Sequence, residues 1–292
     1  LPGTPVLSFG TAGCNLACKF CQNWDISKSR NFDTLADQAM PEDIARMAKA
    51  LDCHSVAYTY NDPVIFMEYA IDTAKECHQL GIAAVAVSAG YINPEPRKEF
   101  YQYMDAANID LKAFTEKFYY KLTGAHLQPV LDTLIYLKKE TDVWFEITTL
   151  LIPDENDSDA ELTRLSEWVI TELGPDVPVH FTAFHPDWKM KDKPSTPFST
   201  LERARQIAMD VGLHFVYTGN VHDSQGSSTY CPKCNQCVIE RDWYDILTYQ
   251  LDDSGYCLHC GHQIAGVFQG PAGSWGRKRQ LVHLAKLLDT KL

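Results

Sequence analysis

Three cysteines near the start of the sequence constrain this chain more than any other feature. Cys14, Cys18 and Cys21 form a C-x3-C-x2-C run that follows Gly13. Cysteine thiolates hold iron–sulfur clusters, and a cubane cluster takes four ligands, one on each iron. Three closely spaced thiolates therefore predict a cluster with one iron left open to bind a small molecule. The alternative, three buried core thiols, fits less well because Gly13 and the short polar spacers are typical of a metal-binding loop.

The rest of the chain alternates between strand-like and helix-like segments. The helical segments 41–51 and 63–80 each begin with Pro, which suits the first turn of a helix, and Gly81 is a stop signal. Further helices are expected over 94–104, 129–140, 159–173 and 200–211. The expected strands are 6–9, 55–60, 82–88, 108–112, 143–152, 178–184 and 214–218.

Repeated strand–helix units predict an α/β fold with parallel strands and right-handed crossovers. Six or seven units suit an open or closed β/α barrel, in which functional residues gather at the carboxyl ends of the strands. The cysteine run directly follows the first expected strand. It should therefore lie at that end of the barrel.

A second cysteine motif lies near the other end of the sequence. Cys231 and Cys234 form one C-x2-C pair, and Cys257 and Cys260 form another after 22 intervening residues. Four thiolates in this arrangement predict a closed tetrahedral site, most often zinc, with rubredoxin-like iron as the alternative. The segment is too small and polar to build its own core, so a metal would supply folding energy. Cys237 is a fifth nearby thiol, interpreted as a bystander, with a spare ligand as the alternative.

Composition limits the class of protein. The chain has 292 residues, is 45% hydrophobic and carries a formal net charge of −12, which disfavours a nucleic-acid partner. It contains no apolar run of membrane-spanning length and no signal-peptide pattern. Seven of its ten cysteines fall in the two motifs, which predicts metal binding in a reducing cytoplasm.

The cysteine run, with the aromatic Phe20 before its third cysteine, resembles that of the radical S-adenosylmethionine (SAM) superfamily. The closer resemblance is to the radical SAM proteins of the AmmeMemoRadiSam system, which are related to the glycyl-radical (pyruvate formate-lyase type) activating enzymes. It implies a partial (β/α)6 TIM-like barrel, which we place over residues 1–225. A small zinc-ribbon-like module would follow over 226–268, and a tail with a short terminal helix over 269–292. The segments that carry the resemblance are 6–14, 21–27, 58–63, 110–112, 144–153 and 181–186.

The resemblance also implies a function. Cys14, Cys18 and Cys21 would hold a [4Fe-4S] cluster that reductively cleaves SAM to a 5′-deoxyadenosyl radical. That radical would remove hydrogen from a substrate, with a protein glycine as the leading analogy. Flavodoxin or ferredoxin would be the reductant, and Memo-like and AMMECR-like proteins are implied partners. The alternative is an iron–sulfur and zinc redox or scaffold protein that does not cleave SAM. The three-cysteine motif disfavours this alternative, because cubane clusters that transfer electrons usually have four cysteine ligands.

Polar residues at the expected strand ends are candidate SAM ligands. Asp110 and Lys112 lie two positions apart and should share one face, either to bind SAM or as a structural ion pair. Asn61 and Asp62 suit the amino group of SAM, a helix cap before Pro63, or both. By the resemblance, His185 would contact the ribose or the departing carboxylate; a purely structural histidine is the alternative. The full set of expected cofactor-binding residues is Phe20, Tyr60, Asn61, Asp62, Ser88, Asp110, Lys112, Thr149 and His185.

Two positions depart from the activating enzymes. Ser88 stands where those enzymes place a cation-binding acid, and Glu146 stands where they tend to carry a basic residue. These departures weaken the inference that this chain shares the cation site and the peptide recognition of those enzymes.

Overall fold

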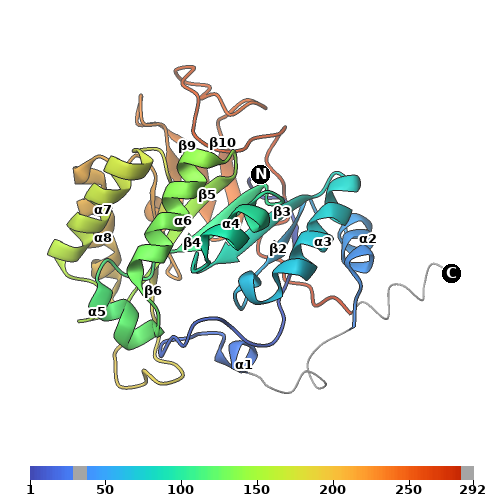
Figure 1. Cartoon of the computed structure of the whole chain (residues 1–292). Helices are drawn as coiled ribbons and strands as arrows, with labels where there is room; N and C mark the ends of the chain where they lie inside the picture. Colours follow the sequence, from blue (N-terminus) through green and yellow to red (C-terminus); the bar gives the residue numbers. More distant parts are fainter. Residues whose placement is uncertain (29–37, 284–292) are drawn as a thin grey trace.

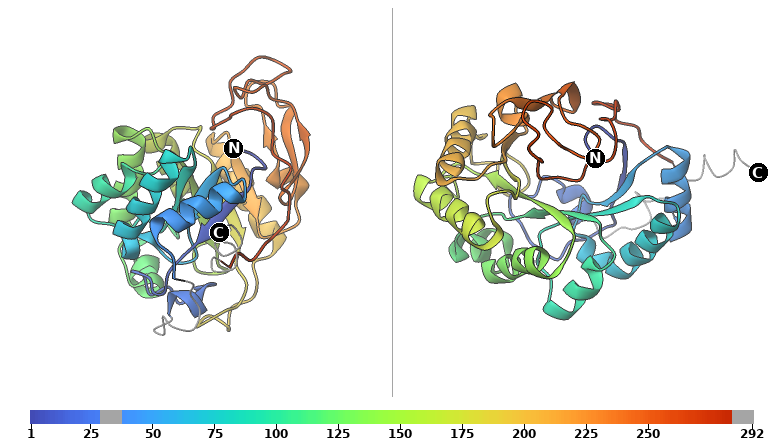
Figure 2. Two further views of the ribbon diagram at one scale, coloured as in Figure 1. Left: turned by 90° about the vertical axis from the view of Figure 1, so that its right-hand side faces the viewer. Right: turned by 90° about the horizontal axis from the view of Figure 1, so that it is seen from above.

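The computed structural model describes residues 1–28 and 38–283. Its largest element is a sheet of seven strands whose spatial order follows the chain, with every neighbouring pair parallel. The sheet curves into an open arc with helices on its outer face (Figures 1 and 2). The strands are β1 (Val6–Phe9), β2 (Ser55–Tyr58), β3 (Ala83–Ser88), β4 (Ala106–Asp110), β5 (Trp144–Leu151), β6 (Val179–Ala183) and β7 (Val216–Gly219). The predicted α/β class is confirmed, with seven strands where the resemblance implied six.

The helices begin and end where local chemistry favours it. The Asp43 carboxylate accepts a hydrogen bond from the Met40 backbone N–H at the start of α2, and Ser158 caps α7. Gly212, at φ +115°, ends α8. The helices are α1 (Trp24–Ser27), α2 (Pro41–Ala50), η2 (Pro63–Phe66), α3 (Met67–Gln79), α4 (Pro94–Tyr101), α5 (Glu116–Phe118), η3 (Tyr119–Thr123), α6 (Leu127–Glu140), α7 (Asp159–Leu173), α8 (Phe198–Val211) and α9 (Ser224–Ser227).

The two faces of the large sheet differ in polarity. Along β5, Phe145, Ile147 and Thr149 are buried, whereas the alternate residues, which include Glu146 and Thr148, are only half-buried. Because side chains alternate across a strand, one face packs on the helices while the concave face stays accessible. The concave face is polar over much of its area, unlike the packed interior of a complete barrel.

A second sheet follows the large one. Its strands β8 (Thr229–Tyr230), β9 (Cys237–Asp242) and β10 (Asp245–Tyr249) are antiparallel, in the order β10-β9-β8. It lies at the upper end of the molecule in Figure 1, opposite α1. The short helix α9 lies between β7 and β8. Most of the helix expected near the carboxyl terminus falls in 284–292, outside the described residues.

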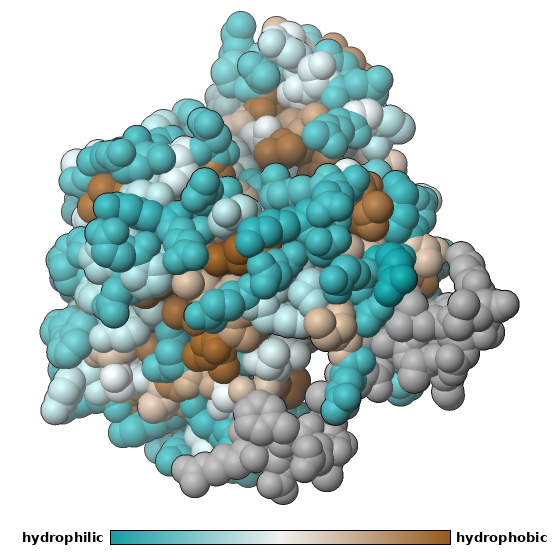
Figure 3. Space-filling view, turned by 45° about the vertical axis from the view of Figure 1, so that its right-hand side comes forward, coloured by the Kyte–Doolittle hydropathy of each residue, from teal (hydrophilic) through white to brown (hydrophobic). Residues whose placement is uncertain are grey.

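Within the described ranges, no helix has both the length and the apolar character needed to cross a membrane. The surface seen in Figure 3 is largely hydrophilic, and its hydrophobic side chains gather in separate patches. One of these patches lies on the upper part of the molecule in that view.

Candidate functional site

The cysteine loop lies across the carboxyl ends of the large sheet's strands. It leaves the end of β1, and its backbone is bound to loops that follow other strands. The Ala17 N–H donates to the Thr123 carbonyl at 2.8 Å, after β4. In addition, the side-chain amide of Asn15 donates to the Tyr91 carbonyl, after β3, at 2.9 Å. The loop is therefore fixed at the end of the sheet where barrel enzymes carry their active sites, as the sequence predicted.

The thiols of this loop lie in surroundings where their charged form needs a cation beside it. Burial raises the pKa of Cys14, and it raises the pKa of Cys18 to about 11. The Leu16 N–H points at Cys14 Sγ at 3.5 Å, and the Ser27 hydroxyl lies 3.1 Å from Cys21 Sγ. A buried thiolate is costly without a cation beside it, and coordination by iron supplies that compensation. The donor set thus fits an iron–sulfur cluster.

The two cysteine groups differ in spacing. The Sγ atoms of Cys231, Cys234, Cys257 and Cys260 all lie within 4.8 Å of one another. Cys231 and Cys260 are 3.6 Å apart, and Cys234 and Cys257 are 3.8 Å apart, close to the roughly 3.8 Å edge of a tetrahedron with 2.3 Å Zn–S bonds. In the part of the chain that the structure describes, Cys14, Cys18 and Cys21 form no such group. A cluster does not require so tight a group, because each thiolate binds a different iron.

The side chain of Asn61 is hydrogen-bonded to the cysteine loop instead of lining an open pocket. Its Nδ2 donates to the Gly13 carbonyl at 2.9 Å and to Thr11 Oγ1 at 3.2 Å. Its Oδ1 accepts from the Thr11 N–H at 3.2 Å. Gly10 makes room for this arrangement, because a Cβ there would lie 2.5 Å from Asn61 Oδ1. Asn61 therefore positions the loop that leads into Cys14, and its predicted contact with SAM stays a prediction.

Asp62 and Ser88 connect two neighbouring strand ends. The Asp62 carboxylate accepts from the Val64 N–H at 3.0 Å, which caps η2, and from the Ala89 N–H at 2.8 Å. The Ser88 hydroxyl donates to both carboxylate oxygens. Burial raises the pKa of Asp62, against the opposing effect of these hydrogen bonds. The capping role considered for Asp62 is confirmed, and a role for either residue in binding SAM stays a prediction.

Asp110 and Lys112 form an ion pair at the end of β4, with 2.9 Å between Lys112 Nζ and Asp110 Oδ2. Burial favours the neutral amine, but Asp110 outweighs this and the pKa of Lys112 rises above its ordinary value. Two residues that the sequence did not single out fix the Lys112 backbone. The Asn156 amide donates to the Lys112 carbonyl at 2.8 Å, and the Tyr119 hydroxyl accepts from the Lys112 N–H at 3.0 Å. This end of β4 thus presents a rigid, permanently charged lysine.

Three other candidates have structural contacts. Phe20 is buried, and its ring lies 5.5 Å from that of Phe118 and 6.0 Å from Lys112 Nζ. Thr149 is buried and donates to the Leu111 carbonyl at 2.7 Å. Tyr60 is exposed, and its hydroxyl lies 2.9 Å from the Ser8 hydroxyl. Phe20 therefore lies between the cysteine loop and Lys112, while Thr149 stabilises the β4 end from within the core.

His185 follows β6 and reaches the cysteine loop, with its Nδ1 2.8 Å from Gln22 Nε2. Beside it, Trp24 stacks on Trp188 with ring centroids 4.9 Å apart and donates to Asp187 at 3.1 Å. Neither Gln22 nor Trp188 was predicted. These contacts bring the loop after β6 to the same site as Cys21 and Lys112.

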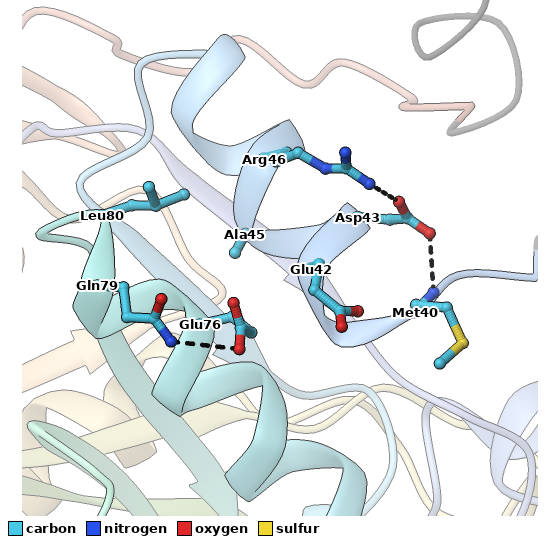
Figure 4. Close-up of a pocket in the computed structure, with 8 residues that line it drawn as sticks. All are labelled: Met40, Glu42, Asp43, Ala45, Arg46, Glu76, Gln79 and Leu80. Atoms are coloured by element: carbon cyan, nitrogen blue, oxygen red, sulfur yellow. Dashed lines mark hydrogen bonds and ion pairs between the residues drawn. The ribbon is translucent and has the colours of Figure 1, made fainter.

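The hollow shown in Figure 4 is not part of this site. It lies between α2 and α3 on the outer surface, and its polar side chains bind one another. Arg46 pairs with Asp43, and Gln79 donates to Glu76 at 3.3 Å. None of the predicted cluster or SAM residues lines it. The lining residues are Met40, Glu42, Asp43, Ala45, Arg46, Glu76, Gln79 and Leu80.

Comparison with known proteins places this site in a family. Residues 9–165 match the radical SAM superfamily. An uncharacterised protein of Methanocaldococcus jannaschii is 39% identical over 264 residues, which cover 90% of this chain and 78% of that protein. The pyruvate formate-lyase-activating enzyme of Listeria monocytogenes is 26% identical over 179 residues, which cover 58% of this chain and 71% of the enzyme.

Solved structures agree at the level of the fold. Streptococcus suis SuiB bound to S-adenosylmethionine superposes with a TM-score of 0.60 at 14% identity. The match covers 74% of this chain and 50% of SuiB, so the chain spans about half of that protein's length. The predicted superfamily and the relationship to activating enzymes are confirmed. With a match over more than half of its residues and the cysteine loop at the expected end of the sheet, this chain belongs to the radical SAM superfamily.

Proposed function

We propose that this protein is a radical SAM enzyme that removes a hydrogen atom from a substrate, with Cys14, Cys18 and Cys21 holding a [4Fe-4S] cluster. The observation that carries the proposal is the convergence of these thiols with the Asp110–Lys112 pair at one end of the sheet. When bound, the cluster and SAM supply a 5′-deoxyadenosyl radical. The protein's own residues hold, orient and shield the cluster and SAM.

Each polar group at this end has a role that follows from its contacts. Lys112 remains cationic and meets the carboxylate of SAM, while Asp110 keeps its ammonium in place. Asn61 fixes the loop before Cys14, and Asn156 and Tyr119 fix the Lys112 backbone. His185, whose Nδ1 lies 2.8 Å from Gln22 Nε2, is proposed to contact the ribose or the departing carboxylate.

For the hydrogen donor we propose a protein glycine, by analogy with the activating-enzyme relatives. Glu146 sets a limit on this analogy, because it presents a carboxylate on the concave face where those enzymes tend to carry a basic residue. The substrate segment therefore differs in charge from theirs. We propose flavodoxin or ferredoxin as the reductant, Memo-like and AMMECR-like proteins as partners, and the cytoplasm as the compartment, where free thiols persist.

The four-cysteine group is proposed as a zinc site. Its sulfur spacing fits a tetrahedral ion, and two of its ligands, Cys231 and Cys257, are buried in an apolar cluster. A closed site of four thiolates has no open position for catalysis. The metal therefore has a structural role.

The test of the proposed substrate is spectroscopic. The reduced, reconstituted enzyme is mixed anaerobically with SAM and each candidate partner protein, and electron paramagnetic resonance is recorded alongside 5′-deoxyadenosine yield. A protein-based radical that forms with one partner and is absent with Lys112→Met supports an activating role. SAM cleavage that no partner stimulates, with no protein radical, contradicts it and points to a small-molecule donor.

A further inference from the structure

The large sheet is an open arc, and β1 and β7 are its two edge strands. In the view from above in Figure 2, the carboxyl-terminal segment (orange to red) occupies the open side of this arc. That segment includes the second sheet and the four-cysteine group, which together we call the cysteine module (residues 229–267). The chain after the module contacts the segment that enters β1, and the module itself contacts the β7 edge.

At the β1 edge the contact is made by backbone. The Gly273 N–H donates to the Pro2 carbonyl at 2.9 Å, and the Trp275 N–H donates to the Gly3 carbonyl at 3.1 Å. The approach is close, because a Cβ built on Gly273 would lie 2.3 Å from the Gly3 oxygen. The chain that leaves the module is thus bound to the segment that enters β1.

At the β7 edge the contact is a shared core. Phe215, just before β7, is buried in one apolar cluster with Val238 and with two of the four cysteines, Cys231 and Cys257. The Tyr217 hydroxyl lies 3.0 Å from Thr229 Oγ1. The two buried metal ligands therefore lie in a small apolar cluster, apart from the main core, and Phe215 and Tyr217 join this cluster to the β7 edge.

The concave face lies behind this contact. The His180 ring stacks on Tyr217 with centroids 4.9 Å apart, and His180 Nε2 lies 2.7 Å from Glu146 Oε2. Arg241 of β9 donates to Thr229 Oγ1 at 2.8 Å, so the module adds a cation to the same row of polar groups. In the strand register His180 is level with Asp110, two strands away. The polar row thus continues from the module to the Asp110–Lys112 end.

We propose that the cysteine module is a wall of the barrel, in which the bound metal joins the β1 and β7 edges and closes the open side. The substrate then reaches the Asp110–Lys112 end through the mouth beside the cysteine loop. This reading of the mouth rests on the proposed function, whereas the closure itself does not. The prediction is that metal loss loosens both sheet edges and not the module alone.

The test is hydrogen exchange followed by mass spectrometry on the full chain. Cys257→Ser removes one ligand, and Cys237→Ser is the matched control, because Cys237 lies in the same module outside the four-cysteine group. With the metal lost, we expect exchange to accelerate about tenfold or more over 1–9 and 214–219 as well as over 229–267. The central strands β3 and β4 and the visible absorbance of the cluster should stay as in the control.

A second variant keeps the metal and the shared apolar cluster and removes only the hydroxyl contact at the β7 edge. Tyr217→Phe deletes the hydroxyl that lies beside Thr229, and it should speed exchange over 214–219 while metal content stays at the control level. Acceleration confined to 229–267 in Cys257→Ser would overturn the proposal, since the module would then be an independent appendage. Equal acceleration in β3 and β4, or loss of the cluster, would also overturn it. None of these readouts depends on SAM cleavage, so failure here is distinct from failure of the proposed function.

Discussion

The side-chain amide of Asn61 donates a 2.9 Å hydrogen bond to the carbonyl of Gly13, the residue immediately before the first cysteine. Through this bond and two to Thr11, the loop after β2 holds the start of the cysteine loop after β1. An amide is suited to this role because it offers a donor and an acceptor side by side. The position of Cys14 thus depends on a residue almost fifty positions away.

Asn61→Ala should therefore weaken cluster assembly. The change removes three hydrogen bonds at a buried position and should cost about 1–3 kcal/mol of stability. We expect a lower iron content after reconstitution and faster loss of cluster absorbance in air. The control is Asn93→Ala, at an exposed helix start with no side-chain capping bond. Equal iron content and equal decay in the two variants would contradict the positioning role.

Variants of the Asp110–Lys112 pair should distinguish its contribution to stability from its contribution to SAM binding. Asp110→Asn leaves the buried Lys112 ammonium without its partner. A buried pair costs about 3–5 kcal/mol to break, and since Asp110 is 35% exposed we expect about 1–3 kcal/mol in denaturant unfolding.

Lys112→Met keeps the volume of the side chain and removes its charge. It should weaken SAM binding about tenfold or more in equilibrium dialysis, which corresponds to about 1.4 kcal/mol. Unchanged SAM affinity in this variant would show that the ion pair is structural only.

Glu146 should make stability depend on pH in acid. Burial alone would raise the pKa of Glu146, but His180 and Trp144 outweigh it and the pKa lies below its ordinary value. Because the folded-state pKa is the lower one, the stabilisation is present above about pH 4.3 and is lost as the pH falls through the folded value. As the pH is lowered over this range, the thermal unfolding temperature of the wild type should fall more steeply than that of Glu146→Gln. Glu202→Gln, on the exposed face of α8, is the control and should follow the wild type.

The metal content of the cysteine module should be independent of the cluster. Elemental analysis of the wild type should give one zinc per chain in addition to the iron of the cluster. Cys257→Ser should lose the zinc and keep the cluster absorbance, whereas Cys18→Ala should do the reverse. Loss of both metals in either variant would mean that the two sites are not separate.

The arrangement of strands could be predicted because it depends on local patterns. The run 6–9 matches β1, and the other expected strands overlap β2 to β7 with errors at their ends. The strand β2 ends at Tyr58, two residues before the end of the expected run 55–60, because Tyr60 turns the chain at φ +71°. At β4 the strand begins two residues earlier than expected, since Ala106 and Ala107 pair with β3 despite a composition that also suits a helix.

The site could be predicted only in part, because its contacts join distant segments. Both cysteine sets follow from spacing alone. The role of Asn61 does not, since it depends on where the loop after β1 crosses the loop after β2. Asn156 and Gln22 gave no signal at all, because a single polar residue in a loop has no pattern until its partners are placed. The contact between the chain after the module and the segment before β1 could not be predicted either, because backbone groups make it: the Gly273 N–H donates to Pro2 and the Trp275 N–H donates to Gly3.

The most direct test of the proposed function is whether the cluster cleaves SAM. The protein is reconstituted with iron and sulfide without oxygen, reduced with dithionite and mixed with SAM, and 5′-deoxyadenosine is measured by chromatography. We expect steady production by the wild type and none by Cys14→Ala. A wild-type cluster that is reduced but neither binds nor cleaves SAM would contradict it.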